Sequence, residues 1–234
     1  RFSEEGDSDM EKLCSDPAFI RPTSGTTGTS KGVLISHQAV LERINAANKE
    51  LELTNKDTVI WVLPMAFHFV VSLVLYIAQG SKIVVAGGLD ADELADKINH
   101  HQGTLLYSSP LHIRLLSQAK SHTNFSTLKR VISTTTAISP SICHAFYERF
   151  KIPVSQAYGI IEIGLPLINS QSNIDEPDNV GRALPDYEIA IFNDKGIALP
   201  EGESGHLGIR GVGMFSGYLN PLTRREDILQ NGFF

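Results

Sequence analysis

The sequence has little cysteine and no strongly basic segment. Only two cysteines, Cys14 and Cys143, occur in 234 residues, and they lie far apart. This spacing implies neither a disulfide framework nor a cysteine zinc site, and it favours a reducing, cytoplasmic setting. The formal net charge is −6, and no cluster of lysine and arginine interrupts it. The charge therefore argues against general nucleic-acid binding.

Long hydrophobic runs are also scarce. Residues 59–78 hold about twenty mostly apolar residues, nominally enough to span a bilayer. Pro64 and His68 interrupt this run, so a buried strand, a proline turn and a core helix explain it better than a membrane span. The first residues given are polar and acidic, so we expect no signal peptide within them. Because the chain begins with Arg1 and ends at Phe234, where a strand is starting, we expect both ends to continue in a longer protein.

Strands alternate with helices over most of the chain, which predicts crossover units and a parallel sheet. The expected strands are 19–21, 59–63, 82–86, 104–107, 130–133 and 153–156, and the expected helices are 36–51, 69–79, 91–100, 110–119 and 140–150. From Gly181 onward, short alternating runs at 188–193 and 205–210 are separated by turn residues, which predicts antiparallel β structure of barrel-like texture. The predicted parts are a polar lead-in (1–16), an α/β portion (17–176) and a barrel-like portion (177–234).

The segment from Thr23 to Gly32, TSGTTGTSKG, combines glycines, hydroxyl side chains and one lysine. Glycines let backbone N–H groups turn toward an anion, hydroxyls donate further hydrogen bonds, and Lys31 adds a positive charge. This composition predicts a loop that grips a polyphosphate. It is not a Walker A loop, because Gly25 and Gly28 are three residues apart and Gly32 follows the lysine. A surface linker of the same composition stays an alternative.

Two further segments hold candidate site residues. Tyr158-Gly159-Ile160-Ile161-Glu162 follows the strand expected at 153–156, and ligands gather at the carboxyl ends of parallel strands. The tyrosine could stack on a purine and Glu162 could bind Mg²⁺, although the pentamer by itself favours a packed tyrosine and a solvated glutamate. His68 lies in an apolar segment, where a histidine is more often a satisfied core residue than a ligand. No serine in a GxSxG context with an identifiable histidine partner is readable.

Five segments, taken in order, resemble the motif series of the adenylate-forming enzymes, which include acyl-CoA synthetases, luciferases and the adenylation domains of peptide synthetases. The segments are TSGTTGTSKG, PMAFH from Pro64, YGIIE from Tyr158, GRALPDYEI from Gly181 and GHLGIRGVGMFSGYLNP from Gly205. The resemblance runs from about Asp16 to Phe234. It implies an α/β fold with parallel-rich sheets flanked by helices, followed by a distorted antiparallel β-barrel-like subdomain.

The resemblance implies an acid–thiol ligase. Such an enzyme uses ATP and Mg²⁺ to convert a carboxylic acid, for instance a fatty acid, to an acyl-adenylate and pyrophosphate. The acyl group then passes to CoA or to the phosphopantetheine of an acyl carrier protein. Because one anion must attack another, catalysis requires charge neutralisation and alignment. The alternative is a degenerate family member that binds nucleotide or an acyl group without turnover.

The resemblance also implies a role for particular residues. Glu162 and His68 would be catalytic, and Thr23 and Glu162 would place Mg²⁺. His68, Phe69 and Val70 would line the pocket of the acid. The nucleotide would be bound by Thr23, Ser24, Gly25, Thr26, Thr27, Gly28, Lys31, Thr134, Thr135, Thr136, Ala137, Ala157, Tyr158, Gly159, Ile161 and Glu162.

The chain departs from the family pattern in the nucleotide pocket. Ile161 stands where the family has a threonine that contacts the α-phosphate, so Ile161→Thr is expected to raise adenylation modestly unless Ile161 is a packing residue. Thr134–Thr136 replaces a glycine-rich adenine loop, and β-branched residues are poor wherever φ is positive. The family's ribose-binding aspartate and lid lysine would lie beyond Phe234. We therefore expect residues 1–234 alone, without the C-terminal lid domain, to be inactive.

Overall fold

The computed structural model describes residues 10–23, 31–65, 68–120, 124–170, 176 and 179–234. The chain folds into two compact units. Unit 1 comprises residues 1–47, 160–166 and 183–234, and unit 2 comprises residues 48–159 and 167–182. The predicted division at residues 16 and 176 stays a prediction.

Unit 2 is built on a parallel sheet. Its strands follow the spatial order β4 (Lys82–Val85), β3 (Thr58–Trp61), β5 (Leu105–Ser108), β6 (Arg130–Ser133) and β7 (Val154–Ile160). The order continues through β8 (Gly164–Ile168) and β9 (Arg182–Ala183), in which the chain passes between the units. The parallel-rich sheet predicted from the alternation of strands and helices is confirmed.

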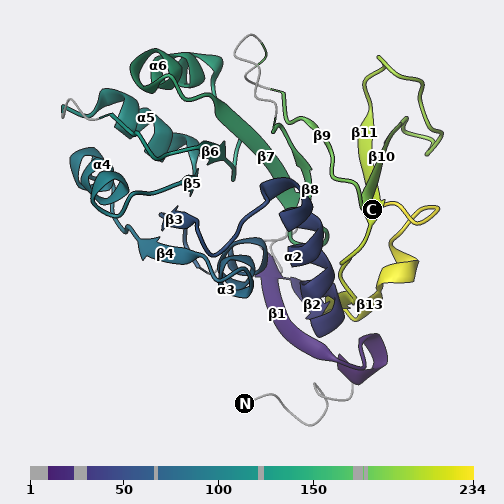
Figure 1. Cartoon of the computed structure of the whole chain (residues 1–234). Coiled ribbons are helices and arrows are strands. Elements are labelled where there is room, and N and C mark those ends of the chain that lie inside the picture. The colour runs from purple at the N-terminus through teal and green to yellow at the C-terminus, as the bar shows by residue number, and fades with distance from the viewer. Residues whose placement is uncertain (1–9, 24–30, 66–67, 121–123, 171–175, 177–178) are drawn as a thin grey trace. The chain divides into compact units, whose positions relative to one another are not determined.

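Three crossover helices cover one face of this sheet: α4 (Ala91–His100), α5 (Pro110–Gln118) and α6 (Pro140–Phe150) (Figure 1). Because side chains alternate between the two faces of a strand, one row of register partners points at these helices. The row is entirely aliphatic and packs in one core with helix residues such as Ile98, Ile113 and Phe146. Its members are Val84, Ile60, Leu106, Val131 and Val154.

The helix expected at 69–79 is less regular than its sequence suggests. Residues Phe69–Val74 form a π-helical segment, η1, in which Val71 leaves helical geometry with a ψ of 16°. A short α-helix, α3 (Leu75–Ala78), follows, and Gly80 ends it with a φ of +69°. The apolar pattern therefore located the element but not its geometry.

Unit 1 is antiparallel. One sheet has the order β1 (Pro17–Thr23), β2 (Lys31–Ser36), β12 (Gly217–Leu219) and β13 (Thr223–Arg224), and η2 (Arg225–Asp227) follows it. A second sheet pairs β10 (Tyr187–Phe192) with β11 (His206–Gly211). These strands confirm the antiparallel structure predicted after Gly181. The core of unit 1 contains Val33, Ile35, Ala39, Phe215 and Tyr218.

Helix α2 (His37–Leu51) begins in unit 1 and ends in unit 2. Ser36 caps it, accepting a hydrogen bond from the Ala39 N–H at 3.0 Å, as its position before the helix predicts. The residues that α2 buries are not simply its apolar ones. Leu41 is 54% exposed, whereas the charged side chain of Arg43 is 4% exposed. An arginine therefore occupies a core position of this helix.

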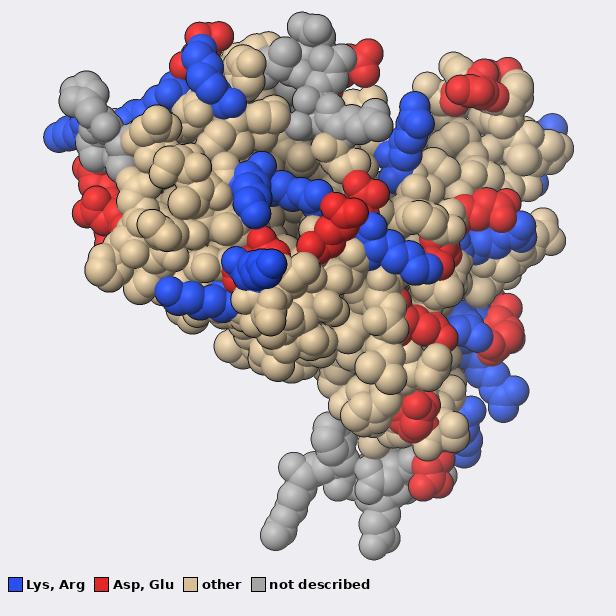
Figure 2. Space-filling view, viewed as in Figure 1, with Lys and Arg blue, Asp and Glu red and all other residues tan. Residues whose placement is uncertain are grey.

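On the face shown in Figure 2, lysine and arginine side chains are interspersed with aspartate and glutamate. Across the described ranges, no helix is both long enough and apolar enough to cross a membrane.

Candidate active site

The predicted phosphate loop is the connection between two paired strands of unit 1. Thr23 at the end of β1 is the register partner of Lys31 at the start of β2. The Thr23 hydroxyl donates to the Lys31 carbonyl oxygen across the hairpin, at 3.5 Å. The residues between them, including Ser24, Gly25, Thr26, Thr27 and Gly28, lie outside the described residues. The structure thus fixes the two ends of the loop next to each other.

Tyr218 connects Lys31 with Glu162. The Tyr218 hydroxyl donates to Glu162 Oε1 at 2.8 Å, and Lys31 Nζ lies 4.9 Å from the centroid of the Tyr218 ring. Burial first, and then the hydrogen bond to Glu162, raise the pKa of Tyr218, so the phenol stays a donor at neutral pH. Unit 1 therefore brings together two of the predicted site residues, Lys31 and Glu162, around a tyrosine, and pairs the third, Thr23, with Lys31 across the hairpin.

Arg21 adds a second positive charge to this cluster. Burial lowers the pKa of Arg21, while the attraction of Glu162 opposes that change, so the two side chains are within electrostatic reach. The Glu162 carboxylate offers oxygen ligands to a cation. The side chains of Lys31 and Arg21 offer positive charge to an anion. Such a cluster is suited to hold a hard cation together with the phosphate groups that the cation neutralises.

In unit 2, candidate residues gather at the carboxyl ends of the parallel strands. Thr134–Ala137 follows β6 directly, and the Thr134 N–H donates to the carbonyl oxygen of Ser108 at the end of β5, at 2.9 Å. Thr134 is buried, whereas Thr135, Thr136 and Ala137 are exposed. Thr135 has a φ of +80°. A β-branched residue in this region is strained, so the expected difficulty of placing threonine in this loop is observed at one position.

Tyr107 links this loop to His68. The Tyr107 side chain is hydrogen-bonded to Thr134, and burial, as the larger influence, raises the pKa of its phenol. The ring of His68 lies edge-on to that of Tyr107, with centroids 6.1 Å apart. Among the remaining residues predicted for the acid pocket, Phe69 is exposed and Val70 is buried. Unit 2 thus joins His68 and Thr134 through one buried tyrosine.

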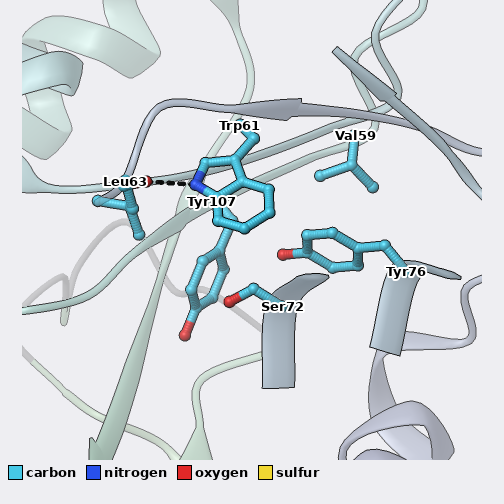
Figure 3. Close-up of a pocket in the computed structure, with 6 residues that line it drawn as sticks. All are labelled: Val59, Trp61, Leu63, Ser72, Tyr76 and Tyr107. Carbon is cyan, nitrogen blue, oxygen red and sulfur yellow. Dashed lines mark hydrogen bonds between the residues drawn. The ribbon is translucent and has the colours of Figure 1, made fainter. Parts of the chain in front are cut away.

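A small aromatic pocket lies on the same face of the sheet as Tyr107. Val59, Trp61 and Tyr107 line it from β3 and β5, and Ser72 and Tyr76 line it from η1 and α3 (Figure 3). The Trp61 indole N–H donates to the Leu63 carbonyl oxygen, and its ring meets that of Tyr76 edge-on, with centroids 6.5 Å apart. Ser72 of η1, the segment that begins directly after His68, thus lines an aromatic pocket.

Strand β7 is longer than the sequence predicts. It extends to Ile160, so Ala157, Tyr158 and Gly159 belong to the strand instead of following it. Ala157 is buried, Tyr158 is half-buried and Gly159 is exposed. Ile161 comes next and packs against the core of unit 1 that contains Val33, Phe215 and Tyr218. The apolar side chain that replaces the usual hydroxyl thus has a packing role.

The oxygen donors of this cluster fit Mg²⁺. Glu162 supplies a carboxylate, one oxygen of which accepts from Tyr218, and the Thr23 hydroxyl lies at the end of the hairpin that carries Lys31. Mg²⁺ usually takes one or two carboxylates, keeps several waters and completes its shell with substrate phosphates, which this set allows. Within the described part of the chain, no group of three or more His, Cys, Asp or Glu side chains is placed to hold a metal ion.

Sequence reasoning missed two tyrosines of the site. Tyr218 lies inside the segment GHLGIRGVGMFSGYLNP, which counts in the family resemblance only as one motif of the series. Tyr107 lies within the short strand β5 and resembles any core aromatic residue. Tyr218 reaches the site because it is the register partner of Val33 in β2. No local sequence pattern reveals a pairing between residues so far apart in the chain.

The profile of the family described as AMP-binding enzyme matches residues 4–219. The chain therefore belongs to the AMP-binding enzyme family. The chain is 26% identical to 4-coumarate–CoA ligase 3 of Oryza sativa subsp. japonica, over 99% of this chain and 45% of that protein. It is 27% identical to tyrocidine synthase 3 of Brevibacillus parabrevis, over 93% of this chain and 3% of that protein.

The fold is similar to that of the amide bond synthetase McbA from Marinactinospora thermotolerans. The TM-score is 0.84 at 26% identity, over 94% of this chain and 45% of that one. These comparisons confirm the resemblance to adenylate-forming enzymes. The chain spans less than half the length of each of these proteins.

Proposed function

We propose that the protein to which this chain belongs activates a carboxylic acid with ATP, forming an acyl-adenylate and pyrophosphate, and then transfers the acyl group to a thiol. The observation that carries the proposal is the cluster of Lys31, Glu162 and Tyr218 at the end of the phosphate-loop hairpin. Family membership supports the same chemistry. Cys14 and Cys143 are buried and form no disulfide with each other, which is consistent with the reducing cytoplasm, where we place the protein.

The proposed roles follow from charge. The loop from Thr23 to Lys31 would hold the β- and γ-phosphates, with Lys31 as a counter-charge. Glu162 and Thr23 would hold Mg²⁺, which supplies Lewis-acid neutralisation of the phosphates when bound. Neutralisation matters because a carboxylate must approach an anionic α-phosphate, and fixed opposite charges lower that barrier.

The residues of unit 2 would bind the organic parts of the substrates. Tyr158 and Thr134–Ala137, with Ala157 and Gly159, would flank the adenine. His68 would close one wall of the acid pocket, and its contact with Tyr107 supports a fixed orientation of the imidazole. Phe69 and Val70 would add apolar lining. The substrate would be a small carboxylic acid, with fatty acids as one class to test.

Acid-dependent exchange of labelled pyrophosphate into ATP by the full-length protein tests the proposal. The panel should contain fatty acids, aryl acids such as 4-coumarate, and amino acids, since relatives named for CoA ligation and peptide synthesis are both similar. Exchange with one class identifies the substrate. Transfer of the activated acyl group to CoA, compared with transfer to a pantetheinylated carrier protein, identifies the acceptor. Absence of exchange with every acid would refute the proposal.

A second candidate function is binding without turnover. The packing of Ile161 against the unit 1 core favours it, because the hydroxyl that the family offers to the α-phosphate is replaced by a structural side chain. Magnesium-dependent ATP binding without pyrophosphate exchange would establish this function.

A further inference from the structure

Arg43 is a buried charge that the proposed chemistry does not use. It lies on α2 in unit 1 and is 4% exposed. Its Nε donates to the Gly213 carbonyl oxygen at 2.6 Å, its Nη1 to that of Ile161 at 2.9 Å, and its Nη2 to that of Glu162 at 2.9 Å. All three guanidinium nitrogens thus bind main-chain oxygens, two of them in the segment that carries Glu162.

The surroundings of Arg43 are shaped to its side chain. Gly164 and Gly213 have φ values of +105° and +67°. A Cβ atom on Gly213 would lie 2.6 Å from Arg43 Cγ, and one on Gly164 would lie 3.1 Å from Arg43 Cδ. The arginine stem therefore occupies the space that side chains at these two positions would fill.

The same helix makes a second contact with the Gly213 turn. Glu42 Oε2 accepts a hydrogen bond from the Gly213 N–H at 2.7 Å. The Glu162 carbonyl oxygen accepts from the Phe215 N–H at 2.8 Å as well as from Arg43. Two donors thus fix this oxygen, one from α2 and one from the segment that leads into β12.

Arg43 remains charged despite its burial. Burial lowers the pKa of Arg43 to about 10, an effect opposed by the attraction of Tyr187 and Glu162. A guanidinium with that pKa is protonated at neutral pH and keeps all its donors. Removing a charged group from water is costly, and a hydrophobic residue in its place often stabilises a protein equally well. Stability alone therefore does not explain why an arginine occupies this position.

We propose that Arg43 is a positioning residue for Glu162: it fixes the main chain of Ile161 and Glu162 so that the Glu162 carboxylate meets Tyr218 beside Lys31. The proposal rests on the proposed function, because Glu162 is taken there as the Mg²⁺ ligand. Arg43 itself touches neither nucleotide nor metal in this scheme. The planar guanidinium donates to three main-chain oxygens at once, a geometry that the single ammonium group of a lysine cannot reproduce.

Arg43→Lys in the full-length protein tests the proposal, because it keeps charge and stem but loses the fork. Arg130→Lys is the matched control. Arg130 also donates to main-chain oxygens, those of Glu50 and Leu51 at 2.8 and 2.9 Å, but within unit 2. The Mg²⁺ concentration for half-maximal pyrophosphate exchange should rise roughly tenfold or more in Arg43→Lys, since small misplacements of an active-site group have effects of that size. It should stay unchanged in Arg130→Lys. An unchanged Mg²⁺ dependence in Arg43→Lys would overturn the proposal.

A double-variant comparison separates positioning from general destabilisation. If Arg43 acts through Glu162, adding Arg43→Lys to the Glu162→Gln variant should leave its pyrophosphate exchange rate nearly unchanged. A change of up to about twofold lies within the error with which mutational effects add. If the two effects multiply, Arg43 acts independently and the proposal fails. Should Arg43→Lys not fold, Arg43→Gln takes its place, because an uncharged amide still donates to one carbonyl oxygen without burying a charge.

Amide hydrogen exchange distinguishes failure of the inference from failure of the proposed function. Arg43→Lys should speed exchange in residues 160–166 while leaving the β3 and β5 amides of unit 2 unchanged. Unchanged exchange at 160–166 would overturn the inference even if the enzyme is active. A wild-type protein that binds ATP with Mg²⁺ but shows no pyrophosphate exchange would refute the proposed function alone. The variants at Arg43, Arg130 and Glu162 would then be compared by their affinity for Mg²⁺ and ATP instead of by their exchange rate. A wild-type protein that neither binds ATP with Mg²⁺ nor exchanges pyrophosphate would refute both the inference and the proposed function.

Discussion

The two units differ in what occupies their interiors. Unit 2 is held by a row of aliphatic side chains that runs across five parallel strands and packs on three helices. Unit 1 contains a smaller apolar core and, beside it, a buried arginine and a glutamate hydrogen-bonded to a tyrosine. Aliphatic burial is non-directional, whereas polar contacts require defined geometry. The described interior of unit 2 thus contains a large aliphatic core, and that of unit 1 places charged groups beside a smaller one.

The largest expected effect is that of Glu162→Gln on activity. The change keeps the shape of the side chain but removes the charge proposed to bind Mg²⁺. Adenylation by the full-length protein should fall by about 100- to 1000-fold, the loss typical when one electrostatic contact to a transition state is removed. The melting temperature should change little. The control is Glu188→Gln, which removes an exposed carboxylate paired with Arg210. Activity within about threefold of the wild type would show that Glu162 has no role in the chemistry.

Leu106→Ala should have the opposite profile. Leu106 is fully buried in the aliphatic row of unit 2, so its truncation should lower the free energy of unfolding by about 2–5 kcal/mol. Denaturant unfolding of the variant measures this loss. Val85→Ala, on the same sheet but 73% exposed, should change the free energy by no more than about 0.5 kcal/mol. Equal losses in the two variants would contradict the assignment of the core.

Gly213→Ala tests how tightly unit 1 encloses Arg43. Gly202→Ala is the control, because Gly202 also has a positive φ, of +92°, but no described atom lies within 4 Å of its added Cβ. The control should lose about 1–2 kcal/mol of stability from backbone strain alone. Gly213→Ala should lose about 1–3 kcal/mol more, because its Cβ would lie 2.6 Å from Arg43 Cγ. Similar melting temperatures for the two variants would show that Arg43 has room to move.

Thr135→Gly should stabilise unit 2. The φ of Thr135, +80°, is natural for glycine and strained for threonine, at a cost of about 1–2 kcal/mol, of which the entropy of glycine offsets about half. A gain near 1 kcal/mol corresponds to a rise in melting temperature of about 2–4 °C for a chain of this size. Thr136→Gly, one residue further along the same exposed loop, should lower the melting temperature. A fall in both variants would contradict the assignment of strain to Thr135.

The smallest expected effect is that of Ile161→Thr. Restoring the usual hydroxyl was expected from the sequence to raise adenylation modestly, but Ile161 packs against the unit 1 core. We therefore expect the melting temperature to fall by a few degrees, for a loss of about 1 kcal/mol, with no gain in adenylation. Ile189→Thr, on the partly exposed strand β10, is the control for losing one isoleucine. Increased adenylation at an unchanged melting temperature would instead restore the interpretation of Ile161 as a lost phosphate contact.

Unit 2 could be predicted closely because its elements are local. The strand 130–133 and the helices 91–100 and 140–150 match the structure to the residue, and Asp90 caps α4 by accepting from the Asp92 and Glu93 N–H groups. Hydrophobic periodicity and capping residues act within one or two turns, so a sequence window contains the whole signal. The π-helical segment at Phe69–Val74 was missed, because its hydrophobic pattern does not differ from that of an α-helix.

The sequence named the motif residues of the candidate site, whose roles stay a proposal, but not the contacts that support them. Thr23, Lys31 and Glu162 could be singled out because the order of the motifs that contain them resembles that of the adenylate-forming enzymes. Arg43 could not, because a charged residue on a helix is ordinarily solvated, and its partners at Glu162 and Gly213 lie more than a hundred residues away in the chain. Long-range polar contacts leave no periodic trace in a sequence.

The pairing of β2 with β12 has a consequence for biosynthesis. Leu34 is paired with Gly217, so the sheet of unit 1 is incomplete until almost the whole of this segment has left the ribosome. At about 5–20 residues per second, the first hairpin waits on the order of ten seconds or more for its partner strand. Residues 48–159 emerge in the meantime and can form the parallel sheet first. During this interval the buried side chains Val33 and Ile35 have no cover from Phe215, and we expect this stretch of the nascent chain to be the one that chaperones bind.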